Sequence, residues 1–223
     1  MATNCIVSSN FVSLSKVSDS AHDPQRIAEY LRTRLKYLRN CRIHIENTLS
    51  DESLEFVNSE DDEGTINRFL FNIDCVVANT FRYSMLIAAC SFLEEAVNLL
   101  CRVSIRDYNQ KLKAIKKGGW LTKHRQLLEA ESSVDIAAVQ EHWDKMADVV
   151  PIRNCITHKW GNVNDCQNSE HDREIAARED SYSVTKDGYL LLNNEAVTYA
   201  LLASQKIVGK LAEDLLGLSR YSI

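Results

Sequence analysis

The chain has little glycine and almost no proline, with 7 and 2 of these residues among its 223. Sandwiches and barrels with many tight turns need more of both, so long helices are favoured. No stretch reaches 18 uninterrupted apolar residues, and we therefore expect no membrane-spanning segment. The first twenty residues lack a basic segment followed by an apolar one, so we expect no signal peptide there.

Several motifs of familiar enzyme classes are also missing. The sequence contains no glycine-rich phosphate loop, no G-x-G-x-x-G, no G-x-S-x-G and no H-E-x-x-H. Phosphate-loop NTPases, dinucleotide enzymes, hydrolases with a nucleophile elbow and zincins are therefore disfavoured. There is no C-x-x-C pair among the seven cysteines, most of which lie in apolar helical patterns. This usage favours buried free thiols, no stoichiometric metal and a reducing, cytoplasmic location.

The composition is that of a globular domain. Hydrophobic residues make up 45% and charged residues 26% of the chain, which excludes a disordered or fibrous protein. A chain of 25.3 kDa can bury about seven tenths of its surface, so its core needs no disulfide or metal. We expect one domain over residues 23–223, preceded by a poorly ordered, serine-rich segment at 1–22.

Apolar residues recur at three- and four-residue spacing along most of the chain, which predicts an all-α fold. An amphipathic helix is expected at 24–50, with Asp23 as its N-cap. A long helix with apolar residues nearly all round is expected at 65–103, bent or broken near 79–84, at the centre of a bundle. Further helices are expected at 107–117, at 120–131, from about 135 onward and at 195–216.

Three segments are expected to be non-helical. Residues 51–63 carry seven acids and no base, and we interpret them as an exposed connection. Residues 162–180 are polar and are interpreted as a loop. The sequence SYSVTKDGYLLL contains two short strand-like runs around Asp187 and Gly188, a dipeptide typical of a two-residue type I′ hairpin turn.

One short segment, IRNCITHKWG, concentrates reactive side chains. Pro151 starts or kinks this segment, and Gly161 ends it. On a helix, Asn154 and His158 are four residues apart and share a face. Arg153 and His158 are separated by roughly 140° around the axis and ~7.5 Å along it. One copy therefore presents them as flanking groups, and a second copy across a two-fold axis would gather two of each in one cleft.

This segment resembles the R-x4-6-H motif of the HEPN superfamily. Arg153 and His158 match the motif, and Asn154 matches the polar residue that often follows the arginine. Two long N-terminal helices, shorter helices, the motif helix and a final helix extend the resemblance to about residues 24–218. The resemblance implies an up-and-down all-α bundle, and the β-hairpin predicted near the C-terminus would be an insertion into that layout. It also implies a homodimer without cofactors, and often a metal-independent endoribonuclease.

In such enzymes the ribose 2′-hydroxyl attacks the adjacent phosphate and leaves a 2′,3′-cyclic phosphate. The resemblance makes His158 the general acid or base, a role that suits an imidazole near neutral pH. Arg153 would neutralise charge on the phosphate, and Asn154 would orient His158 or bind a phosphate oxygen. A toxin or defence effector, with an antitoxin or regulator as partner, is the expected setting. The alternative is a catalytically silent HEPN dimer that binds nucleic acid or regulates a partner.

The same residues also fit two other interpretations. His158 could cap the last carbonyls of its helix, and Arg153 could pair with Glu94 or Glu95, which would make both residues structural. Alternatively, four residues at loose spacing could bind zinc and remove His158 from any catalysis. These four are Cys155, His158, Cys166 and His171.

The charge distribution suggests where RNA would bind. Net charge is −5, but residues 102–125 contain eight Lys or Arg against one acid, Asp107. Residues 24–50 contain six bases against two acids. Such segments either line a track for a phosphate backbone or solvate helix surfaces. The predicted RNA-binding residues are Lys111, Lys113, Lys116, Lys117, Lys123 and Arg125.

Overall fold

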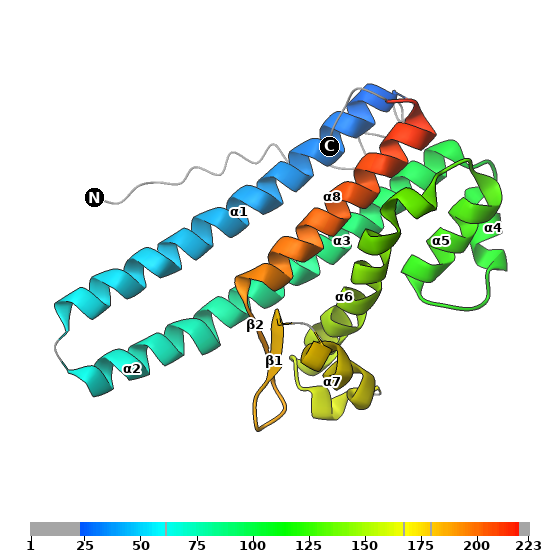
Figure 1. Cartoon of the computed structure of the whole chain (residues 1–223). Coiled ribbons are helices and arrows are strands. Elements are labelled where there is room, and N and C mark those ends of the chain that lie inside the picture. The colour runs from blue at the N-terminus through cyan, green and yellow to red at the C-terminus, as the bar shows by residue number, and fades with distance from the viewer. Residues whose placement is uncertain (1–22, 61, 167, 179, 219–223) are drawn as a thin grey trace.

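The computed structural model describes residues 23–60, 62–166, 168–178 and 180–218. The predicted poorly ordered segment 1–22 lies outside these residues. The described chain is mostly helical, with a small two-stranded antiparallel sheet near its C-terminal end, and this confirms the expected helical class (Figure 1). The helices are α1 (Pro24–Ser59), α2 (Glu63–Phe71), α3 (Asn79–Ser104), α4 (Tyr108–Ala114), α5 (Trp120–Glu131), α6 (Gln140–Lys159), α7 (Ser169–Arg178) and α8 (Asn194–Leu216).

Helix α3 is the centre of the fold. Helices α1, α8 and α6 pack along it, and α4 and α5 cover its C-terminal end (Figure 1). Its buried side chains include Leu86, Leu93, Val97 and Leu100, none of which is accessible to solvent. Burying an aliphatic side chain of this kind contributes about 1.5–3 kcal/mol to folding. The packing of the other helices against α3 is therefore a major source of stability. The expected central helix is therefore confirmed.

Helix α1 is longer than the sequence indicated. It begins where expected, with the Asp23 side chain accepting a hydrogen bond from the backbone N–H of Gln25, but it continues to Ser59. The interpretation of residues 51–63 as a connection is therefore wrong for 51–59 and for the start of α2. Leu and Glu favour helices and no glycine or proline interrupts residues 51–59, so the acidic run stays helical. Phe56 stacks on Phe69 of α2 with ring centroids 3.8 Å apart, which holds the two helix ends together.

The expected irregularity in the second helix is present, but it lies earlier in the chain. Residues Asn72–Ala78 form a π-helical stretch (η2) between α2 and α3, and ordinary helical geometry resumes at Asn79. By length and composition, the continuous helix Glu63–Ser104 could cross a membrane. In this fold 56% of its most apolar window is buried inside the protein, where it forms the core.

The region after α6 contains a helix that the sequence analysis missed. Residues 162–180 were expected to be a loop, but they include a 3₁₀ turn (η4, Val163–Asp165) and α7. Helix α7 has only a narrow buried face, formed by Asp172, Ile175 and Ala176. A face this narrow, with a carboxylate in it, leaves almost no apolar periodicity in the sequence.

The predicted hairpin is present with a different turn. Strands β1 (Tyr182–Val184) and β2 (Leu190–Leu192) pair antiparallel, with Val184 opposite Leu190. The Gly188 N–H bonds to the Thr185 carbonyl at 3.0 Å, so Lys186 and Asp187 are the central residues of the turn. Gly188 has a φ of 90°, whereas Asp187 is not in the left-handed region, which rules out the expected type I′ turn.

Candidate functional site

The predicted motif lies on the last two turns of α6. A 3₁₀ turn (η3, Ile136–Val139) leads into this helix, and the Asp135 side chain caps the turn at the Ala138 N–H. Pro151 lies inside α6, and the helix continues through it without ending. One face of α6 is buried against the bundle through Trp143, Met146, Ile152 and Ile156. The opposite side of its last turns faces solvent.

The structure brings Arg153 and Asn154 together but leaves His158 apart. The Arg153 Nη1 donates a hydrogen bond of 3.0 Å to the Asn154 Oδ1. Arg153 is half-buried, and its Nε is buried without a hydrogen-bond partner. Asn154 and His158 are exposed, and among the residues that the structure describes no hydrogen bond or ion pair reaches His158. Five helical positions separate Arg153 from His158, so the two do not form a contacting pair.

The structural interpretation of Arg153 is not supported by its surroundings. Within the described part of the chain, Arg153 forms no ion pair with either glutamate proposed for it. Glu95 instead accepts hydrogen bonds from Tyr30 at 2.5 Å and Arg34 at 3.3 Å. The guanidinium lies near the Cys90 thiol of α3, where burial raises the pKa of that thiol to about 12 and the nearby Arg153 charge partly opposes the increase. Arg153 therefore retains donors that no described protein group uses.

A left-handed turn ends the motif helix. Trp160 has a φ of 54° and Gly161 a φ of 79°, and the Gly161 N–H bonds to the Cys155 carbonyl at 3.3 Å. A Cβ atom on residue 161 would lie 2.1 Å from the Tyr83 Oη, so only glycine fits against α3 here. Trp160 itself is 85% exposed.

Hydrogen bonds join this turn to the hairpin and to α3. The Leu190 N–H bonds to the Gly161 carbonyl at 2.9 Å, and the Leu190 carbonyl accepts from the Tyr83 hydroxyl at 2.6 Å. Asn79, a buried residue at the start of α3, donates to the same carbonyl at 3.1 Å and accepts from the Leu192 N–H at 2.9 Å. The hairpin thus fixes the end of α6 against the central helix and sets the position of the motif.

The predicted basic residues lie on α4, on α5 and in the connection between them. Lys113, Lys116 and Lys117 are exposed, whereas Lys111 forms an ion pair with Glu131 and Arg125 with Glu129 and Asp144. Lys123 is half-buried. This group lies beside the start of α6, at the opposite end of that helix from the motif (Figure 1). The 14 residues from Asp144 to His158 span about 21 Å, so one chain does not gather the two sets.

The four residues of the zinc interpretation do not come together. His158 and His171 are both exposed, and the His171 Nδ1 lies 4.0 Å from a Glu174 carboxylate oxygen. Cys155 and Cys166 do meet, with Asp172 of α7 as the third member of the group. The thiol sulfurs and a carboxylate oxygen all lie within 4.8 Å of one another. Sequence reasoning missed Asp172 because its helix was interpreted as a loop.

The cysteines are free in the described chain, as expected, but they are not uniformly buried. Cys90, Cys101 and Cys155 are buried, whereas Cys41 is exposed. Burial raises the pKa of the Cys101 thiol to about 12, so this thiol is protonated at neutral pH. These core cysteines behave as small apolar side chains.

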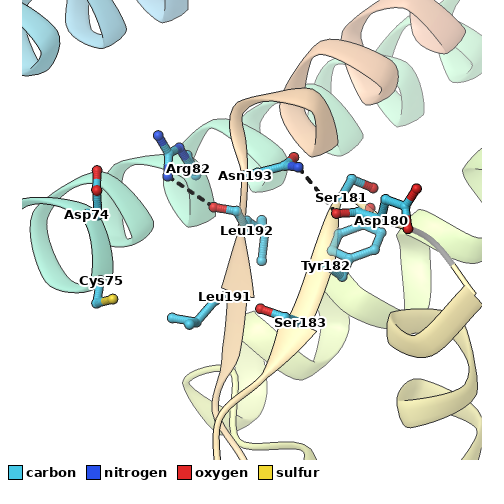
Figure 2. A pocket seen from close by; sticks show the side chains of 10 residues that line it. All are labelled: Asp74, Cys75, Arg82, Asp180, Ser181, Tyr182, Ser183, Leu191, Leu192 and Asn193. Atoms are coloured by element: carbon cyan, nitrogen blue, oxygen red, sulfur yellow. Dashed lines mark hydrogen bonds between the residues drawn. The ribbon is translucent and has the colours of Figure 1, made fainter. Parts of the chain in front are cut away.

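A hollow of about 200 Å³ lies at the base of the hairpin, and none of the three motif residues lines it (Figure 2). Asp74, Arg82 and the Leu192 carbonyl line it, and Arg82 Nη1 donates to this carbonyl at 3.1 Å. Asn193 Nδ2 donates to the Asp180 carbonyl at 3.3 Å on its other side. Arg82 also forms a double hydrogen bond with Glu46, so its charge is neutralised within the protein.

No protein-family model matches this chain, and no curated protein or solved structure is significantly similar to it. The helical class therefore stands on the structure alone. The HEPN resemblance rests on the motif residues and the order of the helices.

Proposed function

We propose that this protein is a HEPN-type, metal-independent endoribonuclease that works as a homodimer. The observation that carries the proposal is the exposed end of α6. There, His158 has no hydrogen-bond or ion-pair partner among the described residues, and it shares a face with Asn154, which holds Arg153. An unengaged imidazole is available for proton transfer, and unused guanidinium donors are available for a phosphate.

The reaction requires only proton transfer and charge stabilisation. A general base takes the proton of the ribose 2′-hydroxyl, whose oxygen forms a bond to the adjacent phosphorus. The bond from phosphorus to the 5′-oxygen breaks, and a general acid protonates that oxygen. The products are a 2′,3′-cyclic phosphate and a 5′-hydroxyl. His158 serves in proton transfer, and Arg153 binds the phosphate oxygens, which gain negative charge in the transition state.

A homodimer follows from the separation of the two side chains. A single chain holds Arg153 and His158 on different sides of α6, so a complete site needs a second copy related by a two-fold axis. Sedimentation is expected to give about 51 kDa, twice the 25.3 kDa of one chain. Bound RNA would extend toward the exposed lysines Lys113, Lys116 and Lys117, each of which releases counterions on contact with phosphate.

The test is an RNA-cleavage assay with a matched histidine control. Replacing His158 by Ala should lower the cleavage rate by roughly 10² to 10⁴ and leave the fold intact. Arg153→Ala should also lower the rate. His44 is an equally exposed histidine on α1, and its replacement by Ala should leave the rate unchanged. A His158→Ala protein that cleaves at the wild-type rate, or a wild-type protein that cleaves no RNA, would contradict the proposal.

Mixing the two inactive variants separates a shared site from a site within one chain. A mixed dimer of Arg153→Ala and His158→Ala chains contains one arginine and one histidine, on different chains. If the site is shared between copies, the mixture should regain part of the activity. If each site uses both groups of one chain, the mixture should stay as inactive as its components.

One observation favours the alternative, a silent HEPN dimer in a binding or regulatory role. The Arg153 Nε is buried, and its Nη1 bonds to a side chain of its own helix, so the guanidinium must reorient to meet a substrate. In a silent dimer the wild-type protein binds RNA or a partner protein without cleaving RNA. The toxin or defence setting, with an antitoxin or regulator, is part of the proposal in either case.

A further inference from the structure

The strongest unassigned cluster lies beneath the motif, on the buried side of α6. Cys155 of α6, Cys166 after η4 and Asp172 of α7 converge there from three segments, with all ligand atoms within 4.8 Å of one another. Cys155 is 3% and Asp172 5% exposed, and Cys166 is half-buried at the rim. Cys166 is therefore the member of the group that is most accessible to solvent.

The Asp172 carboxylate lacks a cation. None of the ion pairs among the described residues includes it, although it is almost entirely buried. Its neighbour is the Cys166 thiol, whose sulfur donates to the Asn162 carbonyl at 3.5 Å. Burying a carboxylate without a positive partner is costly, so this arrangement favours a bound cation.

We propose that Cys155, Cys166 and Asp172 bind a zinc ion, which joins the end of the motif helix to η4 and α7. Two thiolates select zinc over the hard ions magnesium and calcium. Bonds of about 2.0 to 2.3 Å to a tetrahedral ion put ligand atoms roughly 3.5 to 3.8 Å apart. Contraction from at most 4.8 Å requires shifts of no more than about 1 Å. A water molecule at the open side completes the coordination.

The charges balance around such an ion. Both thiols lose their protons on binding, so two protons are released to solvent as two Zn–S bonds form. Two thiolates, one carboxylate and Zn²⁺ sum to a charge of −1. His158 is not one of these ligands: it lies three residues after Cys155, about 60° away around the helix axis, and is exposed where Cys155 is buried.

The experiment measures metal content and does not depend on RNA cleavage. The full chain, purified without chelator in a phosphine reductant, should contain one zinc per chain by elemental mass spectrometry. Cys166→Ser and Asp172→Asn should each lose most of it. Cys75→Ser changes a comparably exposed thiol in η2 and should retain full zinc. Both test variants keep the shape of the replaced side chain, which avoids the folding risk of altering the buried Cys155.

Two further measurements identify the ligands and the effect of the metal. Cobalt substituted for zinc should show a thiolate charge-transfer band that Cys166→Ser roughly halves and Cys75→Ser leaves unchanged. Zinc at 100-fold excess over its dissociation constant should raise the melting temperature of the chelator-treated protein by about 5–10 °C. The proposal would be overturned if the purified wild-type protein contained no zinc and added zinc did not raise its melting temperature. Equal zinc content in all variants, or a Cys155–Cys166 disulfide in the purified chain, would also overturn it.

Discussion

Gly161→Ala is the sharpest test of how the motif helix is held. The glycine has a φ of 79°, and a Cβ added there would lie 2.1 Å from the Tyr83 Oη and 2.7 Å from its Cζ. Real Cβ atoms do not approach other atoms this closely, so either the turn or the tyrosine must move. Tyr83 cannot move freely, because its hydroxyl donates to the Leu190 carbonyl at 2.6 Å.

The cost of this change has three parts. An alanine in the left-handed region costs about 1–2 kcal/mol relative to glycine. Displacing the tyrosine loses a hydrogen bond worth about 1 kcal/mol, and overpacking costs about 1–3 kcal/mol more. The free energy of unfolding should therefore fall by about 3–6 kcal/mol, a large share of the roughly 5–15 kcal/mol typical of a domain. Urea unfolding followed by circular dichroism measures this loss directly.

The matched control, Gly209→Ala, should change the free energy of unfolding in the opposite direction. Gly209 lies inside α8, where an added Cβ meets nothing within 4 Å, so Gly209→Ala should raise the free energy of unfolding by about 0.5–1 kcal/mol. Combining Gly161→Ala with Tyr83→Phe removes the closest clashing atom and should restore part of the loss. A Gly161→Ala protein as stable as wild type would show that the turn does not pack against Tyr83 as described.

Two further predictions concern buried polar groups. Arg82→Ala should lower the free energy of unfolding by about 2–3 kcal/mol, because the Glu46 carboxylate would lose both hydrogen bonds from the guanidinium while its side chain is only 14% exposed. Arg34→Ala breaks the more exposed pair with Glu95 and should cost under about 1 kcal/mol in the same urea titration. Burial lowers the pKa of His124 below its ordinary value of 6.5, so the unfolded chain binds a proton that the folded chain does not. Stability should therefore fall as pH drops below about 6.5, and His124→Gln should flatten this dependence; an equally steep profile in the variant would assign it to other groups.

The helices of the core were predictable because each buries a broad apolar face. The predicted range 120–131 coincides with α5, and 195–216 falls one residue short of α8, which Gly217 ends with a φ of 67°. In both helices the hydrophobic period extends from end to end, and glycine marks one boundary. Where many side chains in a helix must be buried, the sequence carries a strong periodic signal.

The errors lie where little apolar surface is buried. Residues 51–59 extend α1 beyond the core, and no residue of α1 after Leu35 is buried. The acidic composition indicated exposure correctly, but exposure does not exclude a helix. Helix α7 illustrates the same point, since its buried face includes Asp172, a residue that no hydrophobic pattern would place inside. The π-helical stretch Asn72–Ala78 lies in a segment whose apolar residues were expected nearly all round the helix, so the phase shift that it introduces leaves little trace in the sequence.

The candidate site was predictable only in part for a related reason. Helical spacing correctly placed Asn154 and His158 on one exposed face, because both lie within a single helix. The partners of Cys155 depended instead on how η4 and α7 fold back against α6. With that region interpreted as a loop, histidines were chosen by residue type, and the carboxylate that reaches the thiols was overlooked.

Burial divides the last turns of α6 between two roles. From the sequence, zinc binding and catalysis were alternatives, because a zinc ion bound by both Cys155 and His158 would remove the histidine from catalysis. In the structure Cys155 is buried beside Cys166, and His158 is exposed without a described partner. Zinc content and RNA cleavage therefore test different side chains that lie about one turn apart on the same helix. A protein that binds one zinc, and that loses cleavage with His158→Ala and Arg153→Ala but not with His44→Ala, would satisfy both proposals, and failure of either would leave the other standing.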